Sequence, residues 1–306
     1  MENRLNIITL VAEKERLEQE LKSITYGSVE IRDKYIYIHY REDGIALTKY
    51  VGEFGEDLYN LILKNNIKAK ELKKEIKKIV KELKSFGYVE NEITDKVAIN
   101  IDFARKHLVD SVFKQAVLEG IATTYADTET IIEGGKVNNM KADDVLKVIN
   151  LKHAWEFILN KNVVGSPTNF TLLCEINKLV EEGFYYNAGR VRSTPVSIGG
   201  TSWKPEIPIE GIVKEELNQI LNSNLNIVDK AIEILLFTMK KQIFIDGNKR
   251  TAVIFANHLL ISNAKGLIVI PNDKVEEYRT LLINYYEGKD ETTIKNFLKK
   301  FAYKEI

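Results

Sequence analysis

The sequence predicts a mainly α-helical chain preceded by a small α+β module. From Asp95 onward, apolar residues recur at the 3.6-residue period of helices, and only the stretch 189–208 interrupts them. Before that, short runs within residues 27–50 alternate apolar and polar side chains, as half-buried strands do. A length of 306 residues is enough for one large domain and a smaller one.

The N-terminal module is predicted over residues 1–90 as a helix, a β-meander and a second helix. The first helix, residues 3–25, places its apolar side chains on one face: Leu10, Leu17, Leu21 and Ile24. Three strands follow at 27–32, 35–41 and 45–50. Turns are expected between them at Asp33-Lys34 and Asp43-Gly44, and an Asp-Gly pair is a strong hairpin signal.

The second helix of the module, residues 56–86, combines an apolar face with a lysine-rich surface. Its segment 64–84 carries nine Lys against three Glu. The apolar face consists of Leu72, Ile76, Ile79, Leu83 and Phe86. Basic surface beside tyrosine-rich strands is what sequence-independent nucleic-acid binding needs. The alternative, which we favour, is that the lysines solvate a helix whose other face packs on the strands.

The second domain is predicted over residues 91–306, after a break at Gly87–Glu92. Composition excludes several classes of function for the whole chain. The 44 basic and 44 acidic side chains give no global charge that points to nucleic acid or membrane. A single cysteine, Cys174, excludes internal disulfides, and no apolar run is long enough to span a bilayer. We therefore expect a cytoplasmic protein without a membrane partner.

The most informative stretch is 242–250, QIFIDGNKR, which we call the signature loop. Gly247 and Asn248 permit a tight turn, and the apolar run after it predicts a buried helix. Backbone N–H groups at such a turn bind anions, and Lys249 and Arg250 add positive charge. Asp246, directly before the turn, stands where a divalent metal would bridge protein and phosphate. The alternative is an ordinary turn between helices with two solvated cations.

The signature loop resembles the motif HPFx(D/E)GN(G/K)R of the Fic/Doc (Fido) family. It matches at six positions, which are Phe244, Asp246, Gly247, Asn248, Lys249 and Arg250. The resemblance covers about residues 95–303 and implies a Fic-type helical core with a β-hairpin flap. Family members move AMP, or another phosphate-containing group, from a nucleotide to a hydroxyl of a target protein. The cofactors implied are ATP and Mg²⁺.

Two departures from the motif bear on activity. The family's first residue is a His that accepts the proton of the target hydroxyl, and this chain has Gln242 there. A carboxamide cannot act as a general base near neutral pH, and losing that help typically costs ~10²–10⁴-fold in rate. The family's Pro is replaced by Ile243. We therefore expect low activity, with Gln242 as a degenerate base position.

The resemblance extends to two further segments. Residues 189–208 alternate around Gly199-Gly200 and resemble the flap, whose hairpin would clamp a target protein through about 189–206. Residues 119–136 resemble the helix with the inhibitory motif (S/T)xxxE(G/N), and Glu133 is taken as its glutamate. The motif's Ser/Thr position would be Glu129. The alternative is a helix with acidic residues in its first turn.

The resemblance implies a role for each matched residue. Asp246 would hold Mg²⁺, and Gly247 and Asn248 would bind phosphates through main-chain and amide donors. Lys249 would add charge and Phe244 would anchor the loop in the core. Arg250 would neutralise charge in the transition state, with Glu133 restraining it.

Three hypotheses remain open for the chain. The first is a nucleotidyltransferase of low activity, and the second is a pseudoenzyme that binds nucleotide. The third is a nucleic-acid-linked regulator that uses the nucleotide site for sensing.

Overall fold

The computed structural model describes residues 2–42, 45–86, 93–138 and 140–306. It divides into two compact units, Met1–Val89 and Glu90–Ile306, which are described separately below. The predicted Asp43-Gly44 turn and the predicted boundary at Gly87–Glu92 lie outside the described residues.

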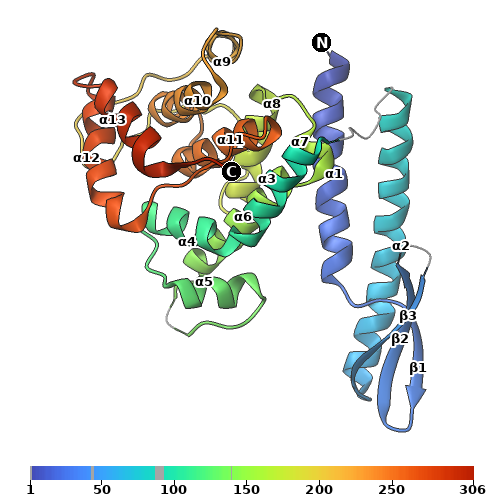
Figure 1. Ribbon diagram of the computed structural model, residues 1–306. Helices are drawn as coiled ribbons and strands as arrows, with labels where there is room; N and C mark the ends of the chain where they lie inside the picture. Colours follow the sequence, from blue (N-terminus) through green and yellow to red (C-terminus); the bar gives the residue numbers. More distant parts are fainter. Residues whose placement is uncertain (1, 43–44, 87–92, 139) are drawn as a thin grey trace. The chain divides into compact units, whose positions relative to one another are not determined.

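The N-terminal unit consists of two long helices and a three-stranded antiparallel sheet in the order β1-β2-β3 (Figure 1). Its elements are α1 (Glu2–Ser23), β1 (Ser28–Arg32), β2 (Tyr35–Glu42), β3 (Ile45–Glu53) and α2 (Glu56–Ser85). Helices α1 and α2 pack side by side. Leu17 of α1 and Leu72, Ile79 and Leu83 of α2 are buried, as their spacing predicts.

The sheet has one face against α2 and one face toward solvent. Ile36 and Ile38 of β2 are buried against Ile62 of α2. The alternate positions Tyr35 and Tyr37 lie on the opposite face, where both rings make edge contacts with Tyr50. The two-residue alternation of a strand therefore separates the isoleucines from the tyrosines.

The regular structure of the second unit is almost entirely helical, which confirms the predicted mainly α fold. Helices α3 to α8 are Asp95–Lys106, Leu108–Leu118, Tyr125–Ile132, Ala142–Ile158, Lys161–Val164 and Phe170–Val180. Helices α9 to α13 are Glu210–Leu221, Ile227–Lys241, Asn248–Ser262, Val275–Tyr286 and Thr292–Phe297. A 3₁₀ turn at Asn272–Lys274 precedes α12, and a π-helical turn at Leu298–Ala302 follows α13. Strands β4 (Leu267–Ile268) and β5 (Tyr303–Lys304) pair antiparallel.

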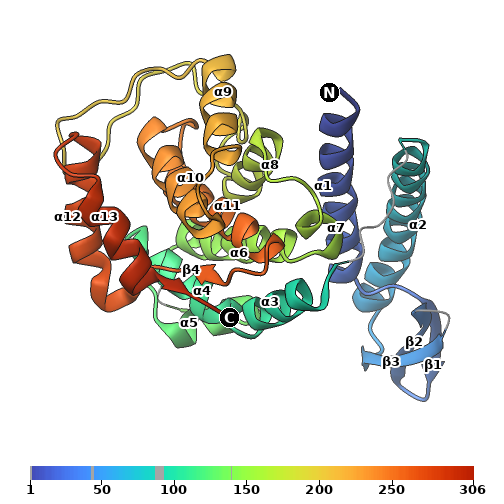
Figure 2. The same ribbon diagram turned by 45° about the horizontal axis from the view of Figure 1, so that its top comes forward.

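Helix α11 is the centre of this unit. It packs against α10, α8, α6 and α3, and its residues 250–261 are all buried (Figure 2). A helix buried on all sides belongs to the core of a larger unit, where other elements surround it. The signature loop connects α10 to the first turn of α11 and is therefore fixed at the core of the unit.

The predicted flap, residues 189–208, is extended but forms no strand pairing. Pro195, Pro205 and Pro208 remove backbone N–H donors that a hairpin ladder would need. The buried guanidinium of Arg192 joins the two arms instead, because it donates to the carbonyl oxygens of Thr194 and Glu206 at 2.6 Å each. The predicted β-hairpin is thus replaced by two arms held by one side chain.

No helix among the described residues is long and apolar enough to cross a membrane.

Two glycines with positive φ, Gly266 after α11 and Gly288 after α12, test whether the close contact of Gly266 with β5 contributes to stability. A Cβ on Gly266 would lie 2.0 Å from the Lys304 carbonyl oxygen, whereas a Cβ on Gly288 would meet nothing within 4 Å. We expect Gly288→Ala to lower the free energy of unfolding by ~1–2 kcal/mol from backbone strain alone. Gly266→Ala adds a backbone clash and is expected to cost a further ~1–3 kcal/mol.

Urea denaturation followed by tryptophan fluorescence measures both variants. Trp155 and Trp203, the two tryptophans of the chain, lie in the second unit, so the signal reports on that unit. Equal losses for the two variants would show that the close approach of Gly266 to β5 contributes no stability.

Candidate active site in the signature loop

The signature loop begins where α10 ends in a left-handed residue, Gln242, at φ 47°. Ile243 and Phe244 follow and are buried, which fixes the loop to the core as expected for Phe244. Asn248 closes the loop, because its Oδ1 accepts from the Phe244 N–H and its Nδ2 donates to the Phe244 carbonyl oxygen, both at 2.9 Å. The Asn248 side chain therefore holds the loop, and only its main-chain N–H remains for a phosphate.

Gln242 is also held by contacts within the protein. Its Nε2 donates to the Met239 carbonyl oxygen at 2.6 Å, which caps the last turn of α10. Its Oε1 accepts weakly from Asn248 Nδ2 at 3.3 Å, and its carbonyl oxygen accepts from Arg192 Nε at 2.6 Å. The Gln242 side chain, which the sequence analysis placed at the family's base position, thus stabilises the loop.

The turn at Gly247 places the first N–H groups of α11 at the surface of the loop. Gly247 has φ 72°, and α11 begins at Asn248. The first-turn N–H groups of a helix have no intrahelical partner and carry the positive end of the helix dipole. Lys249 follows, with a side chain about one-third exposed, and adds a mobile positive charge. Groups of this kind are suited to bind an anion.

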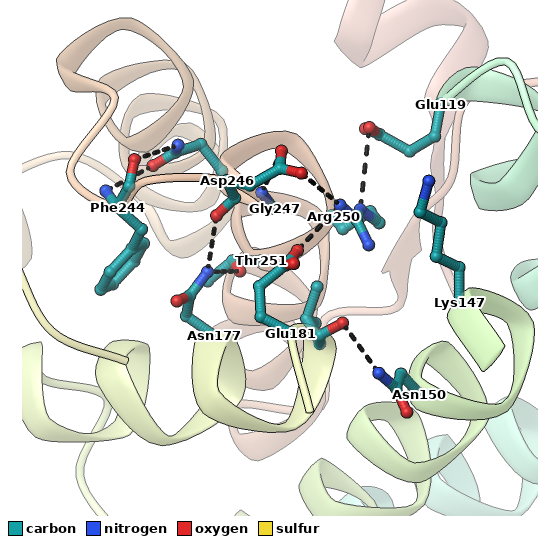
Figure 3. Close-up of polar contacts among 12 residues, drawn as sticks. Glu119, Lys147, Asn150, Asn177, Glu181, Phe244, Asp246, Gly247, Arg250 and Thr251 are labelled. Atoms are coloured by element: carbon teal, nitrogen blue, oxygen red, sulfur yellow. Dashed lines mark hydrogen bonds and ion pairs between the residues drawn. The ribbon is translucent and has the colours of Figure 1, made fainter. Parts of the chain in front are cut away.

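Arg250 is buried among three carboxylates (Figure 3). Its Nη2 lies 2.8 Å from Glu181 Oε1 and 3.6 Å from Asp246 Oδ2, and its Nε lies 3.7 Å from Glu119 Oε2. In the described part of the chain, Nε and Nη1 of Arg250 have no hydrogen-bond partner. Unsatisfied donors on a buried cation are costly, so they mark a place where an anion would be stabilised.

Among the described residues, no ion pair joins Arg250 to Glu133, the predicted inhibitory glutamate. Glu133 caps the C-terminus of α5 and is exposed. The carboxylate beside Arg250 is that of Glu119, at the end of α4, which also lies 3.7 Å from Lys249 Nζ. The segment 119–136 contains two Glu-Gly pairs, Glu119-Gly120 and Glu133-Gly134, and the sequence interpretation took the second. The first pair is the one whose glutamate lies beside Arg250, and Gln115 stands where the motif would have Ser or Thr.

Glu181, at the end of α8, lies in the site although the sequence analysis did not predict it as a site residue. It is 1% exposed, and burial raises the pKa of its carboxyl to about 7 even though Arg250 opposes the shift. A Cβ on Gly247 would lie 2.3 Å from Glu181 Oε1, so only glycine lets this carboxylate lie against the turn. No motif residue marks Glu181, because its role depends on the packing of α8 against α11.

Two buried amides connect the loop to the surrounding helices. Asn177 of α8 donates to the Asp246 carbonyl oxygen and to Thr251 Oγ1, and its own Oδ1 accepts from the Gly189 N–H at the start of the flap. Gln115 of α4 donates to the Arg250 carbonyl oxygen at 2.6 Å and accepts from Trp155 Nε1 at 2.9 Å. A buried amide whose nitrogen donates and whose oxygen accepts a hydrogen bond favours a single arrangement of the helices that it joins.

Asp246 is the residue with which Mg²⁺ would have to associate. No group of three or more possible metal-ligating side chains occurs in the described chain. The Asp246 side chain is half exposed, with Oδ1 accepting from the Gly247 N–H at 2.7 Å. One carboxylate suits Mg²⁺ only when phosphate oxygens and water complete the shell, which is a common arrangement for this ion. The residues therefore fit a metal that arrives with a nucleotide.

A pocket of about 320 Å³ opens beside Lys249, between the flap turn and α12. Gly199, Gly200 and Tyr286 are among its lining residues. The Tyr286 ring stacks on Trp203 of the flap, and its buried hydroxyl has no hydrogen-bond partner in the described residues. A pocket of this size is suited to a small ligand.

Comparison with known proteins supports the resemblance drawn from the motif. Residues 167–260, which span α8 to most of α11, match the model of the Fic/DOC family. No curated protein matches the chain. The predicted resemblance to this family is confirmed by the model match over these residues.

Three solved structures illustrate the similarity of fold. Fic-1 (aa134–508) from C. elegans has 16% identity and a TM-score of 0.55, covering 80% of this chain and 73% of that chain. A Fic domain containing signaling protein from Bacteroides thetaiotaomicron VPI-5482 has 20% identity and a TM-score of 0.51, covering 66% and 80%. A Fic family protein from Desulfovibrio desulfuricans G20 has 16% identity and a TM-score of 0.51, covering 68% and 72%. At these identities the likeness shows the fold.

The pH dependence of stability tests the buried Glu181. Because its pKa is raised from 4.5 to about 7 in the folded state, the folded protein holds a proton that the unfolded chain releases. This contribution is complete below about pH 4.5 and is lost as the pH rises to about 7. Relative to Glu181→Gln, the wild type is expected to lose up to ~3 kcal/mol of unfolding free energy across this window.

Urea denaturation at several pH values between about 5 and 8 measures the difference. Glu182→Gln, a change at the exposed neighbouring glutamate, is the matched control. Parallel stability curves for wild type and Glu181→Gln would contradict a carboxyl that titrates near neutral pH.

Proposed function

We propose that this chain is a Fic-like protein that binds ATP with Mg²⁺ at the signature loop and transfers its phosphate-containing group slowly or not at all. The Fic/DOC match over 167–260 supports the general part of this proposal, because the family is linked to the transfer of phosphate-containing groups. The observation that carries it is the buried guanidinium of Arg250, with two unsatisfied donor nitrogens beside the N-terminus of α11.

Each part of a magnesium nucleotide has a candidate partner in the site. The phosphates would bind the first-turn N–H groups of α11, Lys249 and Arg250. Mg²⁺ would join Asp246 to the phosphates and reduce their charge, as it does in other nucleotide sites. The nucleoside would enter the pocket beside Lys249, which Tyr286 helps to line. We expect binding in the micromolar-to-millimolar range.

Slow transfer follows from the position and contacts of Gln242. A carboxamide cannot take the proton of an attacking hydroxyl, and this one is already bonded to the Met239 carbonyl oxygen. The same observation favours a second candidate function, a pseudoenzyme in which the nucleotide is a regulatory ligand. Nucleotide binding is common to both candidates, and transfer of labelled nucleotide to protein separates them.

Restraint of the site is assigned here to Glu119. Its carboxylate lies near both Arg250 and Lys249 and would repel an additional phosphate from them. ATP carries one more phosphate than ADP and is therefore more strongly affected. Target proteins would meet the site through the flap, whose arms form no strand ladder in the described structure and could accept a strand from a partner.

Calorimetric titration with ATP and Mg²⁺ tests the proposed site. We expect Lys249→Ala and Asp246→Asn each to weaken binding by ~1–3 kcal/mol, because each removes a charged contact. Lys265→Ala, at an exposed lysine past the other end of α11, is the control and should bind as the wild type does. Absence of heat and of competition at millimolar ATP with the folded wild type would refute the proposal.

Two variants test whether Glu119 or Glu133 restrains the binding of ATP. Glu119→Gly is expected to tighten ATP by about tenfold and ADP by much less, since a charge-assisted contact with Arg250 becomes available to the last phosphate. Glu133→Gly serves as the matched control and should leave both affinities unchanged. If Glu133→Gly tightens ATP and Glu119→Gly does not, the structural assignment of Glu119 is wrong.

A further inference from the structure

The N-terminal unit contains a second pocket, which the proposed function does not use. It measures about 310 Å³ and lies between the end of α1, the connection to β1, and strands β2 and β3. Its lining combines aromatic and basic side chains and includes no carboxylate: Leu21, Lys22, Ser23, Ile24, Thr25, Tyr26, Ile38, Tyr40 and Lys49. Lys22 and Lys49 are exposed, so their ammonium groups remain solvated while the two rings are half-buried.

Hydrogen bonds from α2 hold the wall of this pocket in place. Asn65 Nδ2 donates to the Thr25 carbonyl oxygen at 3.0 Å. Asn66 accepts from the Gly27 N–H at 2.8 Å and donates to the Gly27 carbonyl oxygen at 3.0 Å. A Cβ on Gly27 would lie 2.6 Å from the His39 carbonyl oxygen, so the connection passes close over β2. Tyr26, between these anchored residues, is therefore presented in a fixed position.

Tyr26 also connects the pocket to a row of lysines on α2. Lys73 Nζ lies 4.5 Å from the centre of the Tyr26 ring. Five other lysines of α2 are exposed and recur at the spacing i, i+4, i+7, i+11 and i+14. This spacing places them along one side of the helix. They are Lys70, Lys74, Lys77, Lys81 and Lys84. The line is about 21 Å long at 1.5 Å per residue. We call these five residues the lysine row.

The lysine row is not neutralised within the protein. No ion pair joins any of its members to a carboxylate in the described part of the chain, whereas Lys68, off the row, pairs with Glu20 at 2.6 Å. The three glutamates of this stretch, Glu71, Glu75 and Glu82, follow a separate line of the helix at i, i+4 and i+11. Positive charge is therefore concentrated along one side of α2, as binding of a polyanion requires.

We propose that the N-terminal unit binds single-stranded nucleic acid, with one base in the pocket beside Tyr26 and Tyr40 and the backbone phosphates along the lysine row. The pocket and the lysine row thus replace the purely solvating role that the sequence alone favoured for this helix. Aromatic side chains beside a basic track are the combination that binds single strands without sequence preference, because every base can stack and every nucleotide carries a phosphate. A duplex would offer phosphates to the row but no unstacked base to the pocket. The tyrosines therefore favour a single strand.

Anisotropy of a labelled single strand of about 20 nucleotides, as DNA and as RNA, tests this with the full chain. We expect micromolar binding at low salt that weakens steeply between about 50 and 200 mM salt, with a log–log slope near −3 if about four phosphates are contacted. ATP is omitted, so the result does not depend on the signature loop.

Two sets of variants distinguish the contacts. Replacing Lys70, Lys74, Lys77 and Lys81 with Gln should weaken binding at low salt by about tenfold or more and flatten the salt slope. Four exposed lysines of the other unit provide a control with the same change of charge: Lys141, Lys161, Lys265 and Lys300, each to Gln. Tyr26→Leu should weaken binding about fivefold or more and leave the slope unchanged, because stacking releases no counterions.

Vesicles containing an anionic phospholipid are the rival probe, because Leu63 and Ile67 are exposed on α2 ahead of the lysine row. Binding of vesicles but not of oligonucleotides would overturn the proposal. So would equal salt slopes for the lysine-row variant and its control, or the absence of oligonucleotide binding by the wild type at low salt. Circular dichroism of each variant excludes loss of fold as the cause.

Discussion

The second unit depends on how it accommodates one buried cation, Arg250, in the first turn of its central helix. A buried charge is tolerated only when carboxylates and hydrogen bonds compensate its lost hydration. Glu181 supplies the closest carboxylate, at 2.8 Å, while Asp246 and Glu119 lie farther away. The compensation is incomplete, since two donor nitrogens of the guanidinium are left without a partner in the described chain. The site is thus arranged around a charge that an incoming anion would stabilise.

The surrounding residues divide between holding this arrangement and facing a ligand. Side-chain amides form hydrogen bonds within the loop and to neighbouring helices, namely those of Asn248, Asn177 and Gln115. Gln242 does the same at the end of α10, at the position that would correspond to the family's base. Under the proposed function, the helix N-terminus, Lys249, Asp246 and Arg250 would face the ligand. The loop would then keep its phosphate-binding groups, while the side chain at the proton-accepting position has a structural role.

The sequence was informative where a residue's role depends on its near neighbours. Helical periodicity and the motif Asp246–Arg250 predicted the mainly α fold and the turn that opens α11. Contacts between distant segments could not be predicted in this way. Glu181 approaches Gly247 only because α8 packs on α11, and the choice between Glu119 and Glu133 depends on where α4 and α5 end. The flap was expected to be a hairpin. Its prolines instead lack the N–H donors of a strand ladder, and hydrogen bonds from the Arg192 guanidinium join its two arms.

The most direct measurement is transfer of radiolabelled nucleotide to protein by the wild type and by Gln242→His, each in the Glu119→Gly background. A histidine that donates from Nδ1 to the Met239 carbonyl oxygen, as Gln242 does now, would leave Nε2 as the proton acceptor. If the base is the missing part, Gln242→His labels protein ~10²-fold faster than the glutamine form. Equally fast labelling by both forms, with equal nucleotide affinity, would show that Gln242 does not limit the reaction.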